Sequence, residues 1–127
     1  MAILPLKRPQ ISFDCDTTVE EQDLVYVDTN GIMRKAQANS RSTMPAIGWV
    51  TRKLSAGRCE ISDFALIKDL AGVVQGAAYF VSEDVAGAIQ DQPPEDTGFV
   101  LQKVGVGLSS DKLLGQIDPS NIVIRRQ

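Results

Sequence analysis

Two short apolar runs flank a turn in Asp23-Leu24-Val25-Tyr26-Val27-Asp28-Thr29-Asn30-Gly31-Ile32-Met33-Arg34-Lys35-Ala36. Valine, isoleucine and tyrosine favour strands, because their side chains pack well on a pleated surface. The Asn30-Gly31 pair between the runs supplies residues that tolerate positive φ, as a tight turn requires. The stretch therefore predicts a β-hairpin with strands at 24–27 and 32–36.

The same pattern continues toward the C-terminus, where short runs rich in valine and isoleucine alternate with turn residues. Further strands are predicted at 46–51, 58–62, 76–82, 88–90, 99–108, 113–117 and 121–125. Residues 91–97 contain two consecutive prolines and predict an exposed loop. Gly105 and Gly107 fall on one face of their strand and indicate a bend or a close neighbour there.

Residues 62–72 fit two different structures. Ser62 or Asp63 could cap a helix that ends at Gly72, whereas Phe64 and its neighbours also fit a strand followed by a turn. We favour the strand and turn. The whole chain is then predicted to be all-β, as a single small barrel or sandwich of about nine short strands with an extended N-terminal arm.

The N-terminal residues differ in composition from the rest of the chain. Pro5 and Pro9 disfavour a helix, because proline lacks the backbone N–H and restricts the residue before it. We therefore interpret 1–22 as an extended arm with an acidic lead-in, and 23–127 as the β-barrel domain. The apolar residues of the arm could pack on a neighbouring chain, and a frayed terminus is the alternative.

Charge and hydropathy narrow the set of partners. The chain has 13 Lys and Arg against 16 Asp and Glu, a net charge of -3, and its basic residues are scattered. Without a basic excess to neutralise phosphates, nucleic acid is not an expected partner. Every apolar run is far shorter than the roughly 20 residues that cross a bilayer, and no signal-peptide pattern is present. We expect no membrane partner and synthesis in a bacterial-type cytoplasm.

The chain contains no histidine, which is the commonest general base and metal ligand. Its densest carboxylate cluster consists of Asp14, Asp16, Glu20, Glu21 and Asp23. A charge run of this kind favours a solvated face over an acid and base pair, and it lacks the spacing of an EF-hand loop. The sequence therefore predicts no enzyme: no catalytic residue, no metal site and no cofactor.

Two further groups of residues have alternative interpretations. Cys15 and Cys59 lie 44 residues apart and outside any C-x-x-C unit, so two reduced thiols are favoured over a disulfide. Tyr26, Trp49 and Tyr79 could form a sugar-stacking platform if they shared an exposed face. Lone aromatic residues inside valine and isoleucine runs are more often part of a core.

Five segments follow one another in a distinctive order: 23–28 with Asn30-Gly31, 46–50, 76–82, the Pro93-Pro94 loop, and 102–109 with Leu113-Leu114. This order resembles small β-rich modules of tailed-bacteriophage virions, which occur as capsid decoration (cement) proteins and as domains of head and tail fibres. The resemblance covers roughly four fifths of the chain. Cys59 and residues 63–69 depart from it, because they are more polar than the corresponding strand and turn of the group.

The resemblance implies a structural virion protein that decorates and stabilises the capsid. Such a protein binds the lattice of the major capsid protein on the outer capsid surface as an oligomer, here expected to be a homotrimer. A decoration protein is favoured over a fibre subunit because the sequence has no coiled-coil heptads or repetitive shaft. The alternative is a head-fibre or tail-fibre module that binds a host-surface glycan.

Candidate capsid contacts come from the composition of the arm. Apolar and basic side chains in an otherwise irregular segment suit contact with a protein shell, which points to Leu4, Leu6, Lys7 and Arg8. Simultaneous binding to several capsid subunits multiplies the effective concentration, so modest contacts at each site would suffice.

Overall fold

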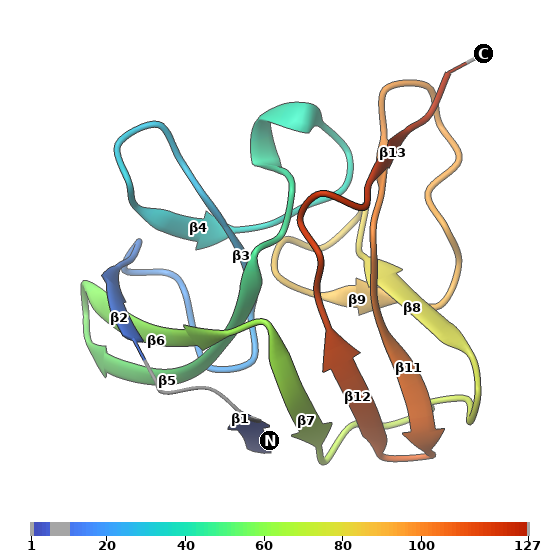
Figure 1. Cartoon of the computed structure of the whole chain (residues 1–127), viewed down its shortest axis with the longest axis horizontal. Coiled ribbons are helices and arrows are strands. Elements are labelled where there is room, and N and C mark those ends of the chain that lie inside the picture. Colours follow the sequence, from blue (N-terminus) through green and yellow to red (C-terminus); the bar gives the residue numbers. More distant parts are fainter. Residues whose placement is uncertain (1, 6–10, 127) are drawn as a thin grey trace.

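The computed structural model describes residues 2–5 and 11–126, and its regular structure is almost entirely β (Figure 1). The strands are β1 (Ala2–Pro5), β2 (Ile11–Asp14), β3 (Leu24–Val27), β4 (Met33–Lys35), β5 (Gly48–Ser55), β6 (Arg58–Ser62), β7 (Phe64–Lys68), β8 (Ala78–Val81), β9 (Ile89–Gln90), β10 (Val100–Leu101), β11 (Lys103–Ser109), β12 (Lys112–Gln116) and β13 (Val123–Ile124). Within the described ranges, the 3-10 turn η1 (Arg41–Thr43) is the sole helical element. None of the helical structure described has the length and apolarity needed to span a membrane.

The strands form two main sheets and one small pair. A six-stranded sheet has the order β1-β7-β12-β11-β8-β9, a five-stranded sheet has the order β2-β6-β5-β3-β4, and β10 pairs with β13. Every strand pair within these sheets is antiparallel. The two main sheets do not close on one another, so the fold is a sandwich and the barrel alternative is wrong.

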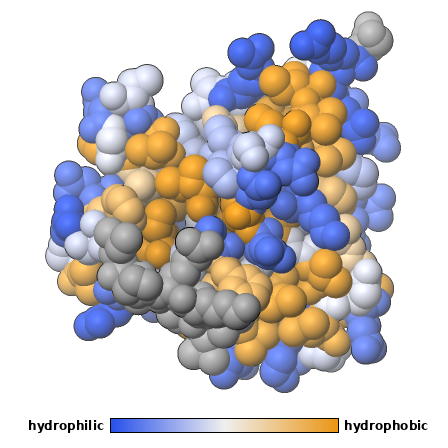
Figure 2. All heavy atoms as spheres, viewed as in Figure 1, coloured by the Kyte–Doolittle hydropathy of each residue, from blue (hydrophilic) through white to orange (hydrophobic). Residues whose placement is uncertain are grey.

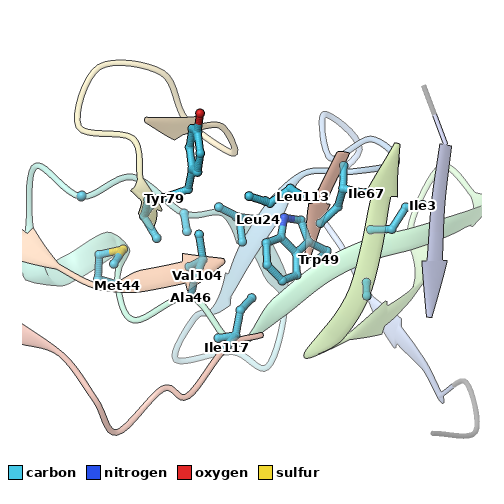
Figure 3. Close-up of a cluster of buried hydrophobic side chains, with 14 of the residues drawn as sticks. Ile3, Leu24, Met44, Ala46, Trp49, Ile67, Tyr79, Val104, Leu113 and Ile117 are labelled. Carbon is cyan, nitrogen blue, oxygen red and sulfur yellow. The ribbon is translucent and has the colours of Figure 1, made fainter. Parts of the chain in front are cut away.

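The core lies between the two main sheets (Figure 3). Leu24 and Trp49 project into it from the five-stranded sheet, and Ile67, Tyr79 and Leu113 project from the six-stranded sheet. All five side chains are buried, which removes their apolar surface from water and drives the two sheets together.

The described part of the predicted arm belongs to the sheets. Strands β6 and β7 are separated by Asp63 alone, and β1 pairs with β7 while β2 pairs with β6. The N-terminal residues thus complete the edges of both sheets, and Ile3 is buried in the core. The physical reason is that the backbone N–H and C=O groups along β6 and β7 need partners, which the extended N-terminal chain supplies.

The acidic lead-in also has a structural role. Residues 15–22 cross the second face of the five-stranded sheet, where Val19 is fully buried against a second apolar cluster. The backbone N–H of Asp16 donates to the carbonyl of Met33 at 2.9 Å, and the Lys53 ammonium donates to the carbonyl of Val19. The five-stranded sheet is therefore covered on both faces.

Most strand predictions are confirmed, beginning with the hairpin of β3 and β4, in which Gly31 has a φ of +80°. The strand interpretation of residues 62–72 is also confirmed, because β7 lies within them. The described residues form thirteen strands, more than the nine expected. Part of the excess comes from the N-terminal strands, and part from the division of the predicted strand 99–108 at Gln102.

Gln102 lies between β10, which pairs with β13, and β11, which pairs with β8 and β12, and its side chain binds the backbone of Ala46. It is fully buried, its amide oxygen accepts from the N–H of Ala46 at 2.8 Å, and its amide nitrogen donates to the C=O of Ala46 at 2.8 Å. The close neighbours predicted at Gly105 and Gly107 are also confirmed. A Cβ atom would lie 2.7 Å from the carbonyl oxygen of Leu114 at Gly105, and 2.1 Å from that of Val74 at Gly107.

Candidate interaction face

The face of the six-stranded sheet that points away from the core carries an apolar row. Successive side chains of a strand point to opposite faces, so the buried Ala65 and Ile67 place Leu66 on the outside of β7. Leu66 is paired with Leu114 on β12, and Leu114 is paired with Val106 on β11. Directly opposed side chains of this kind lie close enough to form one continuous surface.

The row widens at its two sides. Val106 is paired with Ala78 on β8, and Phe80 follows two residues later on the same face. On β7, Phe64 stands two residues before Leu66. We name this surface the outer apolar face, and it consists of Phe64, Leu66, Ala78, Phe80, Val106 and Leu114, all half-buried.

Figure 2 shows the apolar character of this region directly, because apolar atoms gather over the lower halves of β7, β12 and β11. At the end of β11, Leu108 keeps 42% of its surface exposed. Contiguous apolar surface of this kind marks interaction sites, whereas isolated exposed apolar residues are ordinary. The arrangement is suited to binding another protein surface.

A hollow of about 330 Å³ lies on the outer apolar face. Val106 and Leu114 form part of its lining, and Gly105 lies beside them without a side chain. Asp118 and Asn121, from the segment that follows β12, also line the hollow. Because Lys103 and Gln116 line it as well, the hollow presents both polar and apolar groups to a partner.

The margin of the outer apolar face is charged. Lys103 is exposed and is paired with Phe80, and Lys112 lies 3.5 Å from Asp111. Hydrogen bonds from the side chain and the backbone N–H of Ser120 hold the pKa of Asp118 below its ordinary value. An apolar centre with a charged margin is the usual composition of a protein–protein interface.

Sequence reasoning missed this surface, although the residues that form it were visible. The segment Phe64-Ala65-Leu66-Ile67 is apolar at four consecutive positions, so alternation cannot tell which face is inside. Consecutive apolar residues in a strand indicate that both faces are apolar. That signal, together with the paired Leu113-Leu114, could have identified the outer apolar face.

The candidate capsid contacts fall in different places. Leu4 is part of β1, where its backbone is paired with that of Leu66. Leu6, Lys7 and Arg8 lie outside the described residues. The structure therefore places the backbone of Leu4 beside that of Leu66 and does not describe the other three predicted contacts.

The carboxylates of the lead-in have separate partners on different strands. Asp14 contacts Arg58 at 2.8 Å, and Asp16 contacts Arg34 at 2.6 Å. Hydrogen bonds from the backbone and side chain of Thr18, together with Arg34, hold the pKa of Asp16 below its ordinary value. Among the described residues, no three His, Cys, Asp or Glu side chains are arranged to hold a metal ion.

Asp23 differs from Asp16 because its pKa is raised. Burial raises its pKa, because desolvation disfavours the charged form, although the backbone N–H of Glu20 donates to it at 2.8 Å. Its nearest cation is the ammonium of Lys35 at 3.8 Å. This carboxylate holds the turn at 20–23, and its partners are groups of the protein itself.

The aromatic residues do not form an exposed platform. Trp49 and Tyr79 are buried in the core, which confirms the core interpretation for these two residues, and Tyr26 is half-buried against it. The hydroxyl of Tyr79 accepts a hydrogen bond from the N–H of Val74 at 2.8 Å. Trp49 and Tyr79 therefore cannot stack on a sugar without unfolding of the core.

Cys15 and Cys59 are both free thiols, as the sequence favoured, and both are buried. In comparisons with known proteins, no family model, no curated protein and no solved structure matches this chain.

Proposed function

We propose that this chain is a structural protein of a tailed-bacteriophage virion, which decorates the capsid by binding the lattice of the major capsid protein as a homotrimer. The observation that carries the proposal is the outer apolar face, defined above by six side chains on four adjacent strands. A face of this composition gains free energy when a partner surface removes it from water. Its partner in this proposal is the capsid shell.

The order of elements supplies separate support. Segments 76–82, 102–109 and 113–114, on which the resemblance to virion modules chiefly depends, contribute to β8, β11 and β12. These three strands lie side by side in the six-stranded sheet. The same three strands contribute four of the six residues of the outer apolar face.

Continuity with the N-terminal strand favours the shell as the partner of this face. Leu4 is paired with Leu66 at one end of the apolar row, and the predicted contacts Leu6, Lys7 and Arg8 follow in the sequence. One large partner could then meet both the face and the residues after β1. Because the capsid repeats its subunits, weak contacts of each copy of a trimer would add to tight binding.

The test is a binding assay with expanded capsids that lack the protein. The purified chain is mixed with the capsids, the capsids are pelleted, and bound copies are counted by gel densitometry. We expect saturation at a fixed number of copies and increased resistance of the capsids to heat. Absence of capsid binding would contradict the proposal.

Two matched variants identify the surface involved. Leu114→Gln introduces an amide into the centre of the outer apolar face, and Leu54→Gln makes the same change at an exposed position on β5, in the other sheet. We expect Leu114→Gln to weaken capsid binding by about tenfold or more, and Leu54→Gln to leave it unchanged. Equal effects would exclude the outer apolar face as the contact surface.

The remaining predicted contacts need a variant that keeps β1. Charge reversal at Lys7 and Arg8 leaves the β1 sequence intact, and we expect it to weaken binding in a salt-dependent way. Light scattering coupled to size-exclusion chromatography tests the oligomeric state. A trimer is expected, and a monomer at all concentrations would contradict that part of the proposal.

A further inference from the structure

A pocket of about 220 Å³ opens between the two main sheets. Trp49 on β5 lines it from the five-stranded sheet, and Ile67 on β7 and Leu113 on β12 line it from the six-stranded sheet. In Figure 3 the indole lies beside the side chains of Ile67 and Leu113. Leu70 and Ile89 also line the pocket and are half-buried, so it extends from the surface into the main core.

The lining of the pocket suits an uncharged molecule. Among the described residues, no charged side chain lines it, and Gln22 contributes its single side-chain amide. The amide nitrogen of Gln22 donates to the C=O of Lys68 at 3.3 Å, so this group already has a partner in the protein. The hollow on the outer apolar face differs, because Lys103 and Asp118 line it. An ion that entered the pocket would lose its hydration without meeting an opposite charge, whereas an apolar molecule would gain from leaving water.

Contacts around the pocket keep its walls apart. The indole of Trp49 packs so closely on Gly115 that a Cβ atom there would lie 2.3 Å from the ring, and a shift of the ring into the pocket would lose this contact. On another side of the pocket, the N–H of Gly87 donates to the C=O of Ala36 at 2.7 Å, and its C=O accepts from the N–H of Leu24 at 2.9 Å. The pocket is therefore formed before any ligand arrives, as is usual for small-molecule sites.

We propose that this pocket binds a compact, neutral aromatic molecule of the alkylbenzene class. Apolar protein cavities of about 150 Å³ bind benzene, so a pocket of about 220 Å³ has room for a ring that carries a short alkyl group. The indole of Trp49 supplies an aromatic surface against which a second ring can pack in an offset or edge-to-face arrangement. The aliphatic side chains of Ile67, Leu70 and Leu113 supply the remaining apolar contacts.

The pocket is separate from the outer apolar face. Successive residues of β12 point to opposite faces of the sheet, so the buried Leu113 points into the core while Leu114 belongs to the outer apolar face. A ligand in the pocket would therefore leave the outer apolar face uncovered. The proposal is independent of the function proposed above for the same reason.

The experiment titrates the full chain with toluene at neutral pH and follows the fluorescence of Trp49, the single tryptophan of the chain. We expect a saturable change with one molecule bound per chain, and a Tm that rises with toluene concentration, because the ligand binds the folded state. Benzoate is the matched probe, since it carries the same ring with an ionised carboxylate, and we expect it to bind about tenfold more weakly or less. Methyl NMR spectra locate the site, with shifts expected at Ile67, Leu70 and Leu113.

Ala88→Leu tests the site by filling it, because Ala88 lines the pocket and is half-buried. We expect this variant to bind toluene about tenfold more weakly or less, and Ala71→Leu, at an exposed position outside the lining, to bind it as the unsubstituted chain does. Equal binding of toluene by the two folded variants would overturn the proposal. In the unsubstituted chain, three outcomes would also overturn it: a fluorescence change that does not saturate, equal binding of benzoate and toluene, or methyl shifts confined to Leu66 and Leu114 of the outer apolar face.

Discussion

The indole ring of Trp49 occupies the space above Gly115, where any side chain would stand. A Cβ atom on Gly115 would lie 2.3 Å from both Cη2 and Cζ3 of Trp49, and 2.9 Å from Cδ1 of Ile67. Trp49 comes from β5 and Gly115 from β12, so this contact joins the two main sheets. It fixes how closely the sheets approach, because protein interiors are packed at the density of organic crystals.

Gly115→Ala is expected to destabilise the fold by about 2 to 4 kcal/mol, because the added methyl group forces the indole or the β12 backbone to move. Urea unfolding followed by tryptophan fluorescence measures the change. Gly57→Ala is the matched control, since the nearest atom to its added Cβ is 3.9 Å away. A Gly115→Ala variant as stable as Gly57→Ala would show that the sheets are farther apart than described.

The pair Gln102 and Ala46 gives a second prediction. Gln102→Leu keeps the side chain similar in size but leaves the buried N–H and C=O of Ala46 without their partner. Unsatisfied buried polar groups are costly, so we expect a loss of about 2 to 4 kcal/mol in the free energy of unfolding. Hydrogen exchange of the Ala46 amide should accelerate in the same variant. Gln37→Leu, at a half-buried position, is the control and should cost less.

The ion pair of Arg34 and Asp28 leads to a prediction about how the stability of the fold depends on pH. Its guanidinium contacts Asp28 at 2.6 Å, and this hydrogen bond holds the pKa of Asp28 below the ordinary value of 3.8. A carboxyl group with a lowered folded-state pKa contributes stability above pH 3.8, and that contribution is lost as the pH falls through the folded-state value. Arg34→Gln should therefore lower the urea midpoint at neutral pH and should make stability less sensitive to acid.

The comparison is made between pH 7 and pH 3. The difference in urea midpoint between Arg34→Gln and the unsubstituted chain should narrow as the pH falls below 3.8. Arg52→Gln is the control, because Arg52 is 4.0 Å from Glu60 and largely exposed, where an ion pair contributes little. If the difference in urea midpoint between the two proteins stays constant with pH, the ion pair of Arg34 and Asp28 is excluded as the cause of the pH dependence.

Ile3 tests whether β1 is docked in solution. Its side chain is 7% exposed and belongs to the main core, so Ile3→Ala should lower the free energy of unfolding by about 2 kcal/mol. Val123→Ala, at a position 51% exposed, should change it by less than about 0.5 kcal/mol. Equal stabilities would mean that β1 is not part of the folded sheet. The expected loss also means that deletion of residues 1–10 would alter both stability and any shell contact.

Local preferences explain which parts of the fold were predictable. The hairpin of β3 and β4 was predictable, because Asn30-Gly31 favours a turn irrespective of what surrounds it. Strand β7 was favoured correctly over a helix. The polar residues within 63–69 did not indicate which strands β7 would pair with. The division at Gln102 was not predictable, because the chain pairs with β13 before Gln102 and with β8 and β12 after it, and no local pattern indicates this change of partner.

The candidate site was predictable only in part. The sequence singled out Leu4 by composition, and the register of β1 places it in line with Leu66. The rest of the outer apolar face was missed, because it is assembled from strands that are adjacent in space and far apart in the chain. The carboxylates of the lead-in were seen as one charge run, yet Asp14 binds Arg58 on β6, Asp16 binds Arg34 on β4, and Asp23 accepts from its own turn.

The sequence by itself determined that this chain is all-β and where many of its strands and turns lie, because those properties depend on the conformational preferences of neighbouring residues. The tertiary structure alone decided that the N-terminal residues complete both sheets and that Cys15 and Cys59 belong to one buried cluster. It also decided which face of Phe64–Lys68 is buried. Both faces of that strand are apolar, so its orientation is set by packing against distant residues such as Trp49 and Leu113, which no local pattern contains.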